Sequence, residues 1–232
     1  MARKKKHQTV NSRARNIVAG DNPKSPIAEQ FRTIRTNLQF TSVDQELESM
    51  LVTSASPAEG KSITTANTAV VFAQQGKKTL LVDADLRKPT IHYTFRVANT
   101  SGLSNYLVGN EQVFKLASET HIDNLDVVTC GPIPPNPSEL LGSKKMQRFI
   151  EEAKQSYDMI VFDTPPVLAV TDSQVLSNFV DGVLLVVRSK QTEKEAAVKA
   201  KESLEQAQAN ILGVVLNDQD LKSSNYYYYY GQ

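Results

Sequence analysis

The sequence predicts an α/β fold in which a mostly parallel sheet carries helices on both faces. Short, continuous apolar runs alternate along the chain with segments of helical periodicity, as expected for strands that are buried on both sides. The chain also passes from the first apolar run through Gly60, Lys61 and Ser62 into a helical pattern, and aspartates follow two later runs. Together these observations predict a sheet whose strands end at a ligand site.

The expected elements can be placed in order along the chain. Pro23 and Pro26 mark a linker, after which apolar residues recur at spacings of four, three and four and predict an amphipathic helix over residues 26–41. Strands are expected at residues 50–53, 79–82, 125–129, 159–162, 182–187 and 211–216. Helices are expected at residues 61–75, 144–156 and 192–209, and in a further segment that begins at Asp172.

The chain has 232 residues, of which 40% are hydrophobic, enough for one domain with a sizeable core. Its apolar runs are far shorter than the roughly 18 residues that cross a bilayer, so no membrane span is expected. Cys130 is the only cysteine and can form no internal disulfide, which favours the cytoplasm. We therefore expect a flexible basic arm at residues 1–22, a globular domain at 23–217 and a flexible tail at 218–232.

The charges are unevenly distributed. Six of the 26 Lys and Arg residues precede the first acidic residue, Asp21, so the remainder of the chain carries more acidic than basic side chains. Such a body argues against nucleic acid as a partner, whereas the basic arm suits an anionic lipid surface or a partner protein.

The segment from Ala55 to Ser62 has the context of a phosphate-binding loop, because a strand precedes it and a helix follows it. Backbone N–H groups at the helix start would surround phosphate oxygens, Lys61 would contact the β and γ phosphates, and Ser62 would hold Mg²⁺. Ala55 replaces the first glycine of the general motif. The sequence thus predicts a P-loop NTPase-like domain that binds a nucleotide through Pro57, Ala58, Glu59, Gly60, Lys61, Ser62, Ile63 and Asn217.

Three aspartates follow strands at the edge where parallel strands present their ligands. Asp83 and Asp85 follow one strand, where they would face the same side if the strand continued through them, and Asp163 follows another. With Lys61 they are the expected catalytic residues: Asp85 and Asp163 would join Ser62 in holding Mg²⁺, and Asp83 or Asp85 would accept the proton of an attacking hydroxyl. The alternative is that each aspartate only caps a helix or a turn.

The sequence resembles a known family, the bacterial tyrosine kinases (BY-kinases) of capsule and exopolysaccharide pathways. The resemblance covers residues 24–232 and is carried by residues 29–35, 57–62, 82–89, 131–140 and 162–166 and by the tyrosine cluster of the tail. In this family the loop usually has glycine where Ala58 stands. A positive φ at Ala58 would cost about 1 kcal/mol or more.

The resemblance implies an ATP- and Mg²⁺-dependent protein-tyrosine kinase that regulates polysaccharide synthesis and export. It implies phosphorylation in trans of the tail residues Tyr226, Tyr227, Tyr228, Tyr229 and Tyr230, and homo-oligomeric rings that use Glu29, Arg32 and Arg35. It also implies other tyrosine-containing protein substrates and a transmembrane activator that recruits the kinase to the inner face of the cell membrane.

Two other functions compete with this interpretation. A partition or cell-division ATPase of the deviant Walker type would carry a signature lysine near Ser56, yet no lysine lies between Met50 and Gly60. A nucleotide-binding scaffold without catalysis is compatible with Ala58. Incubation with labelled ATP would distinguish the three functions. A kinase would label tail tyrosine, an ATPase switch would release only free phosphate, and a scaffold would do neither.

Overall fold

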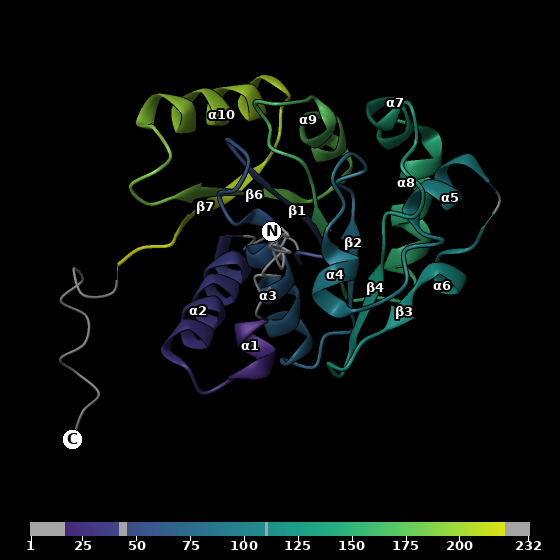
Figure 1. Ribbon diagram of the computed structural model, residues 1–232, viewed down its shortest axis with the longest axis horizontal. Helices are drawn as coiled ribbons and strands as arrows, with labels where there is room; N and C mark the ends of the chain where they lie inside the picture. Colours follow the sequence, from purple (N-terminus) through teal and green to yellow (C-terminus); the bar gives the residue numbers. More distant parts are fainter. Residues whose placement is uncertain (1–16, 42–45, 110, 221–232) are drawn as a thin grey trace, which may run out of the picture.

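The computed structural model describes residues 17–41, 46–109 and 111–220 (Figure 1). Its strands are β1 (Ser49–Ser54), β2 (Thr79–Asp83), β3 (Ser118–Glu119), β4 (Leu125–Val128), β5 (Met159–Asp163), β6 (Gly182–Arg188) and β7 (Ile211–Asn217). They form one sheet in the order β3-β4-β2-β5-β1-β6-β7. The pairings are parallel except for that of β3 with β4, so the predicted mostly parallel sheet is confirmed.

Helices cover both faces of this sheet (Figure 1). One face carries α1 (Val18–Asp21), α2 (Pro26–Thr41), α3 (Lys61–Ala73) and α4 (Ile91–Phe95). The opposite face carries α5 (Leu103–Val108), α7 (Pro137–Leu141), α8 (Lys144–Lys154), α9 (Asp172–Leu176) and α10 (Lys194–Gln206). The remaining helices of the described residues are the short α6 (Val113–Leu116) and the 3₁₀ helix η1 (Ser177–Phe179).

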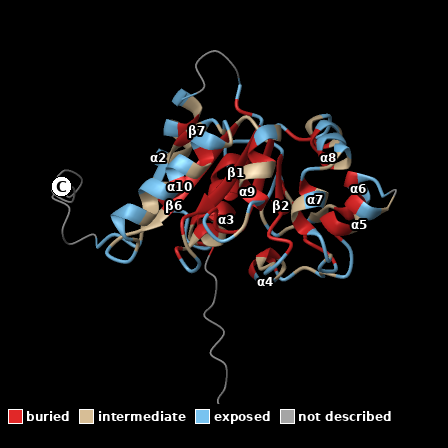
Figure 2. Ribbon diagram, turned by 90° about the horizontal axis from the view of Figure 1, so that it is seen from above, coloured by how far each residue is buried: buried red, intermediate tan, exposed pale blue. Residues whose placement is uncertain are grey.

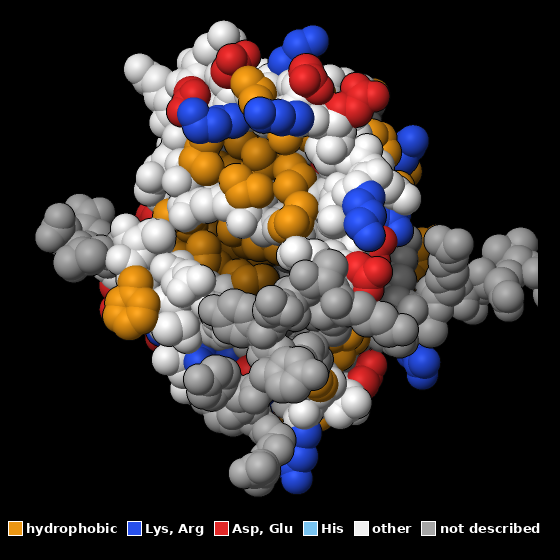
Figure 3. Space-filling model, turned by 90° about the vertical axis from the view of Figure 1, so that its left-hand side faces the viewer, with side chains coloured by type: hydrophobic (Ala, Val, Ile, Leu, Met, Phe, Trp, Pro, Cys, Tyr) orange, Lys and Arg blue, Asp and Glu red, His pale blue; other side chains and the backbone are white. Residues whose placement is uncertain are grey.

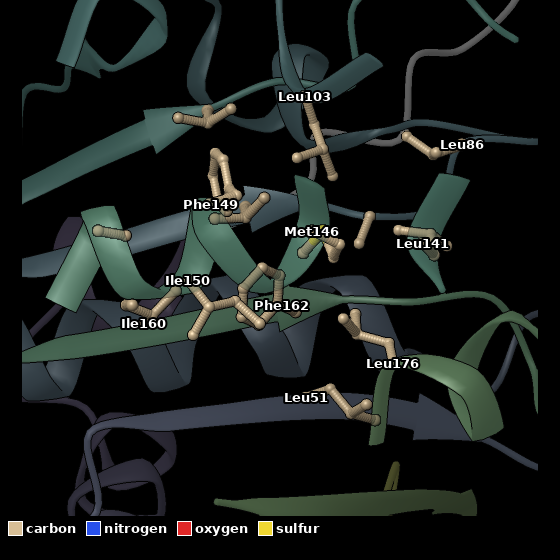
Figure 4. Close-up of a cluster of buried hydrophobic side chains, with 14 of the residues drawn as sticks. Leu51, Leu86, Leu103, Leu141, Met146, Phe149, Ile150, Ile160, Phe162 and Leu176 are labelled. Carbon is tan, nitrogen blue, oxygen red and sulfur yellow. The ribbon is translucent and has the colours of Figure 1, made fainter. Parts of the chain in front are cut away.

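The core is divided by the sheet because side chains alternate along each strand. In β5, Ile160 and Phe162 face the helices α8 and α9, while Met159 and Val161 face α3. Figure 4 shows Phe162 packed among Phe149, Met146 and Leu176. The central strands are buried along their whole length, as Figure 2 shows, and this rigid layer holds the ends of the strands in place.

One predicted boundary is wrong. The flexible arm was expected to extend to residue 22, but Ile17 and Ala19 are buried and α1 begins at Val18. The Ala19 N–H donates to Asn67 Oδ1 at 2.8 Å, and Gln74 donates to the Ala19 carbonyl at 2.8 Å. These contacts join residues 17–21 to α3, so that the folded domain includes them. Residues 1–16 lie outside the described part of the chain.

The strand β7 lies at one end of the strand order, next to β6. Its side chains Val214 and Leu216 are exposed, and Figure 3 shows hydrophobic side chains gathered on this side of the molecule below a row of charged ones. The carboxyl end of β7 lies beside the phosphate-binding loop, so the last strand contributes to the site described next.

Candidate active site

The loop between β1 and α3 adopts the conformation that phosphate binding requires. Gly60 has φ 89° and precedes the first helical residue, Lys61. A Cβ at Gly60 would lie 2.0 Å from Asn217 Nδ2, so only glycine fits there. No side chain of the described residues caps the start of α3, which leaves its first N–H groups to serve an anion.

Ala58 also has a positive φ, 65°, which is the conformation that the sequence analysis identified as unfavourable for alanine. An alanine in this region costs about 1 kcal/mol or more relative to glycine. The loop therefore contains two left-handed positions, Ala58 and Gly60, on either side of Glu59, and alanine disfavours this conformation at the first of them.

Lys61 lies between two of the predicted carboxylates. Its Nζ is 3.1 Å from Asp163 Oδ1 and 3.2 Å from Asp85 Oδ2, and it donates to Ser62 Oγ at 3.2 Å. Burial alone would lower the pKa of Lys61, but Asp163 and Asp85 raise it above its ordinary value. Burial raises the pKa of Asp163 and Lys61 opposes that effect. Because the two charged atoms are 3.1 Å apart, we take the ion pair as charged.

Asp83 is fully buried, and its two oxygens have different surroundings. Oδ2 accepts hydrogen bonds from the N–H groups of Thr90 and Ile91, both at 2.9 Å, where α4 begins. Oδ1 has no hydrogen-bond partner within the described residues. Burial, followed by the charge of Asp163, raises the pKa of Asp83 to about 7. One oxygen thus caps a helix, as the alternative interpretation held, and the other is left for a proton.

The two aspartates of this segment do not lie on one continuous strand, which corrects the sequence-based expectation. β2 ends at Asp83, so Asp85 stands in the connection that follows it. There Asp85 Oδ1 accepts from the Lys88 N–H at 3.0 Å and Oδ2 contacts Lys61. The turn, and not strand alternation, brings Asp85 to the site.

The oxygen ligands here fit Mg²⁺, a hard cation that prefers oxygen. Asp163 Oδ2 is buried and accepts no hydrogen bond from the described residues, and Ser62 and Asp85 both lie at Lys61 Nζ. Across residues 17–41, 46–109 and 111–220, no group of three or more His, Cys, Asp or Glu side chains is arranged to hold a metal by itself. Ser62, Asp85 and Asp163 are the residues that would hold a magnesium ion beside the phosphate loop.

The remaining predicted residues fall into two groups. Asn217, at the end of β7, donates to the Glu59 carbonyl at 2.9 Å, and Ile63 lies in the first turn of α3, so both adjoin the loop. Tyr226, Tyr227, Tyr228, Tyr229 and Tyr230 lie outside the described residues.

The proposed interface residues on α2 make contacts within the chain. Arg32 contacts Glu29 at 2.6 Å and the Pro23 carbonyl at 2.5 Å, and Arg35 donates to the Val71 carbonyl at 2.9 Å. Glu29 is exposed and both arginines are half-buried. Their role between subunits stays a prediction.

Sequence reasoning missed two groups near the site. Arg87 forms a bidentate ion pair with the buried Asp172, at 2.9 and 3.0 Å, which connects the segment carrying Asp85 with α9. Arg188 contacts the phosphate loop from the end of β6. The signal that indicated Asp163, a polar residue at the carboxyl end of a buried strand, was also present at Arg188.

The fold and the site together define a P-loop nucleotide-binding protein. A family described as the AAA domain matches residues 58–214. The chain is 52% identical to the tyrosine-protein kinase YwqD of Bacillus subtilis over 94% of its own length and 92% of that protein's. It is 45% identical to the putative tyrosine-protein kinase CapB of Staphylococcus aureus over 98% of this chain and 99% of that one. The chain therefore belongs to the bacterial tyrosine kinases of the capsule type, as its sequence predicted.

Solved structures agree with this assignment. The kinase domain of the Escherichia coli tyrosine kinase ETK matches with a TM-score of 0.85 and 38% identity, over 92% of this chain and 84% of that one. The chimerical protein CapA2B2 matches with a TM-score of 0.83 and 44% identity, over 86% and 88% of the two chains. The septum site-determining protein MinD of Pyrococcus horikoshii, at 23% identity, a TM-score of 0.62 and coverage of 73% and 69%, shares the fold alone. Within the described segments, no helix has the length and apolar character to cross a membrane.

Proposed function

We propose that this protein transfers the γ-phosphoryl group of ATP to protein tyrosines, including the tail tyrosines of a neighbouring copy of itself. The observation that carries the proposal is the buried ammonium of Lys61, held between Asp163 and Asp85 beside the uncapped start of α3. A positive charge, a set of hard oxygen ligands and free backbone donors are the components that phosphoryl transfer requires.

Each residue has a defined task in the transfer. Lys61 would exchange a carboxylate contact for the β and γ phosphates, and the N–H groups at the start of α3 would fix the phosphate oxygens. The tyrosine oxygen forms the new bond to phosphorus, the bond from phosphorus to the β–γ bridging oxygen breaks, and ADP leaves. Asp83 Oδ1 accepts the phenolic proton, for which a pKa of about 7 is well matched. Mg²⁺, when bound, offsets the charge of the phosphates, and Ser62, Asp85 and Asp163 are the residues that would hold it.

The tail is the proposed substrate and switch. Five consecutive tyrosines follow the last described residues by only a few positions, and a segment of this length can reach an adjacent subunit. Each phosphate would add about −1.5 to −2 charges. Several such charges would repel one another and the acidic site, so the modified tail would leave and a ring built through Glu29, Arg32 and Arg35 would loosen.

The cellular part of the proposal rests on family membership. We propose that the kinase regulates capsular or extracellular polysaccharide synthesis and export. A transmembrane activator would bring it to the inner face of the membrane and raise its activity, and other tyrosine-containing proteins would serve as further substrates. The Escherichia coli tyrosine kinase etk is much longer than this chain, which covers only 30% of its length. The rest of that protein leaves room for an activator segment joined to the kinase in one chain.

A mixing experiment tests the reaction and its direction. One variant carries Lys61→Met with an intact tail, and the other has wild-type Lys61 with all five tail tyrosines replaced by Phe. Each alone should take up little label from γ-labelled ATP, whereas the mixture should label the tail of the Lys61→Met chain. Release of free phosphate without labelled tyrosine would instead indicate an ATPase switch, and neither product would indicate a scaffold.

Light scattering tests the switch separately. Wild-type assemblies should lose mass after Mg²⁺-ATP is added, and the five-Phe variant should remain assembled while it still binds ATP. Heavy phosphorylation of the wild-type protein without any loss of mass would refute the switch and leave the kinase intact.

A further inference from the structure

The phosphate loop is held from outside by the end of β6. Arg188, the last residue of β6, donates from Nη1 to the carbonyl of Ala58 at 3.2 Å. The other atoms of the same guanidinium, Nε and Nη2, donate to Asp218 Oδ2 at 2.9 and 2.7 Å. One planar side chain therefore spans the loop and the residue that follows β7, a geometry that the fixed donors of arginine allow and a lysine cannot reproduce.

The next residue of the loop is held in the same way. Glu59 is only 4% exposed, and its Oε1 accepts from the hydroxyl of Thr192 at 2.6 Å. The same hydroxyl oxygen accepts from the backbone N–H of Arg188 at 2.7 Å. On the other side, Asn217 donates to the Glu59 carbonyl at 2.9 Å. Two successive loop residues are thus anchored to the β6–α10 connection and to the end of β7.

The loop needs such an anchor because its own conformation is unfavourable. Ala58 has φ 65°, a position in which a non-glycine residue persists only when its surroundings impose it. The bond from Arg188 fixes the carbonyl of this residue, and the bonds to Glu59 fix the next peptide. The N–H groups that would bind the phosphates follow directly after these two residues. A change in the backbone conformation of Ala58 or Glu59 would therefore displace these N–H groups.

We propose that Arg188 is a positioning residue that holds the phosphate loop in its nucleotide-binding shape and joins it to the start of the tyrosine-bearing tail through Asp218. It acts through Ala58 and touches no reacting atom. This inference rests on the proposed function in so far as the nucleotide is ATP.

Substitutions should separate this role from a general effect of charge. Arg188→Gln should weaken ATP binding about fivefold, a modest value because the side chain is 30% exposed. The change should appear in the KM for ATP with little change in kcat, as expected when ground-state and transition-state binding are lost together. Arg188→Lys should recover part of the affinity, since an ammonium can reach only one of the two acceptors.

A double-mutant cycle tests the link to the tail. Asp218→Asn should weaken ATP binding by less than Arg188→Gln, because it releases one end of the arginine and leaves the bond to Ala58. In the Arg188→Gln background, Asp218→Asn should not weaken ATP binding further, because the side chain that connects Asp218 with Ala58 has already been removed. Additive losses would show that Asp218 acts on its own and would overturn the link.

Lys190→Gln is the matched control. It removes a positive charge from the same connection, but the Lys190 side chain is 74% exposed and its ion pair with Asp220 is long, at 3.9 Å. ATP affinity should match that of the wild type. An equal loss in Lys190→Gln and Arg188→Gln would mean that charge near the site, and not the anchor, sets the affinity, which would refute the proposal.

The deciding measurement needs no nucleotide and no catalysis. Amide hydrogen exchange of the full chain, followed by mass spectrometry, should show faster exchange in the peptide covering residues 55–62 in Arg188→Gln, with the β1 and β5 peptides unchanged. Titration with a fluorescent ATP analogue then gives the change in affinity. Wild-type exchange in this peptide would overturn the proposal, even if the kinase is active. Faster exchange in Arg188→Gln, together with a wild-type protein that never labels tyrosine, would support the anchor and refute the proposed kinase reaction.

Discussion

Replacing Asp83 by Asn should change how the stability of the protein depends on pH. The pKa of Asp83 is raised from 3.8 to about 7, mainly by burial. The unfolded chain releases the proton near pH 4 and the folded protein near pH 7, so folding takes up a proton in between. Stability attributable to this group is therefore fully present at low pH and is lost as the pH rises towards 7.

The size of the effect follows from the shift. A pKa raised from 3.8 to about 7 corresponds to about 4 kcal/mol, with a slope of at most about 1.4 kcal/mol per pH unit. Asparagine does not titrate, and its side-chain oxygen can still accept from Thr90 and Ile91. The variant's unfolding free energy, measured relative to the wild type, should thus rise by about 3 kcal/mol between pH 5 and pH 8. Tail phosphorylation should fall strongly at the same time, because the proton acceptor is missing.

Urea unfolding of both proteins at pH 5, 6, 7 and 8, at constant ionic strength, measures this difference. Asp123→Asn provides a control, since Asp123 is an exposed carboxylate away from the site. Its curve should remain parallel to that of the wild type. If the curves for Asp83→Asn and the wild type were also parallel, Asp83 would not be a buried carboxyl that holds a proton near neutral pH, and its assignment as base would fail.

Three further variants test other parts of the site and the assembly. Lys61→Met should abolish tail labelling, and undiminished labelling would show that the loop is misassigned. The variant should fold but be less stable at pH 8 than at pH 5, because Asp163 and Asp85 lose their counter-ion. Ala58→Gly should raise the free energy of urea unfolding by about 0.5 kcal/mol, as relief of the left-handed alanine slightly exceeds the entropy of glycine, and a decrease would contradict this. Arg32→Ala with Arg35→Ala should yield smaller oligomers in sedimentation, and an unchanged profile would exclude α2 from the interface.

Much of the fold could be predicted because its signals are local. The runs at residues 50–53 and 159–162 are short, apolar and alternate with helical segments, which favours buried strands, and they correspond to β1 and β5. The loop ending in Lys61 and Ser62 is contiguous, so its place between strand and helix follows from neighbouring residues alone. The same holds for Asp163, whose position at the carboxyl end of a parallel strand determines the edge on which it lies.

Other features depended on contacts between residues far apart in the chain. α1 is short and has weak helical periodicity, and it folds because Asn67 and Gln74 of the α3 region satisfy the backbone groups of Ala19. The ion pair of Arg87 with Asp172 joins residues 85 positions apart, a distance over which spacing carries no information. No motif in the sequence announces these pairs, because either partner alone looks like an ordinary surface residue.

The sequence by itself determined the fold class, the phosphate loop and the family, since each depends on residue types in consecutive positions. Only the tertiary structure decided the state of the site. Burial beside Asp163 gives Asp83 its raised pKa, and the turn after β2 brings Asp85 to Lys61. The anchoring of Ala58 by Arg188 spans 130 positions. Electrostatic environment and strain are properties of surroundings, and the surroundings of a residue exist only once distant segments have packed together.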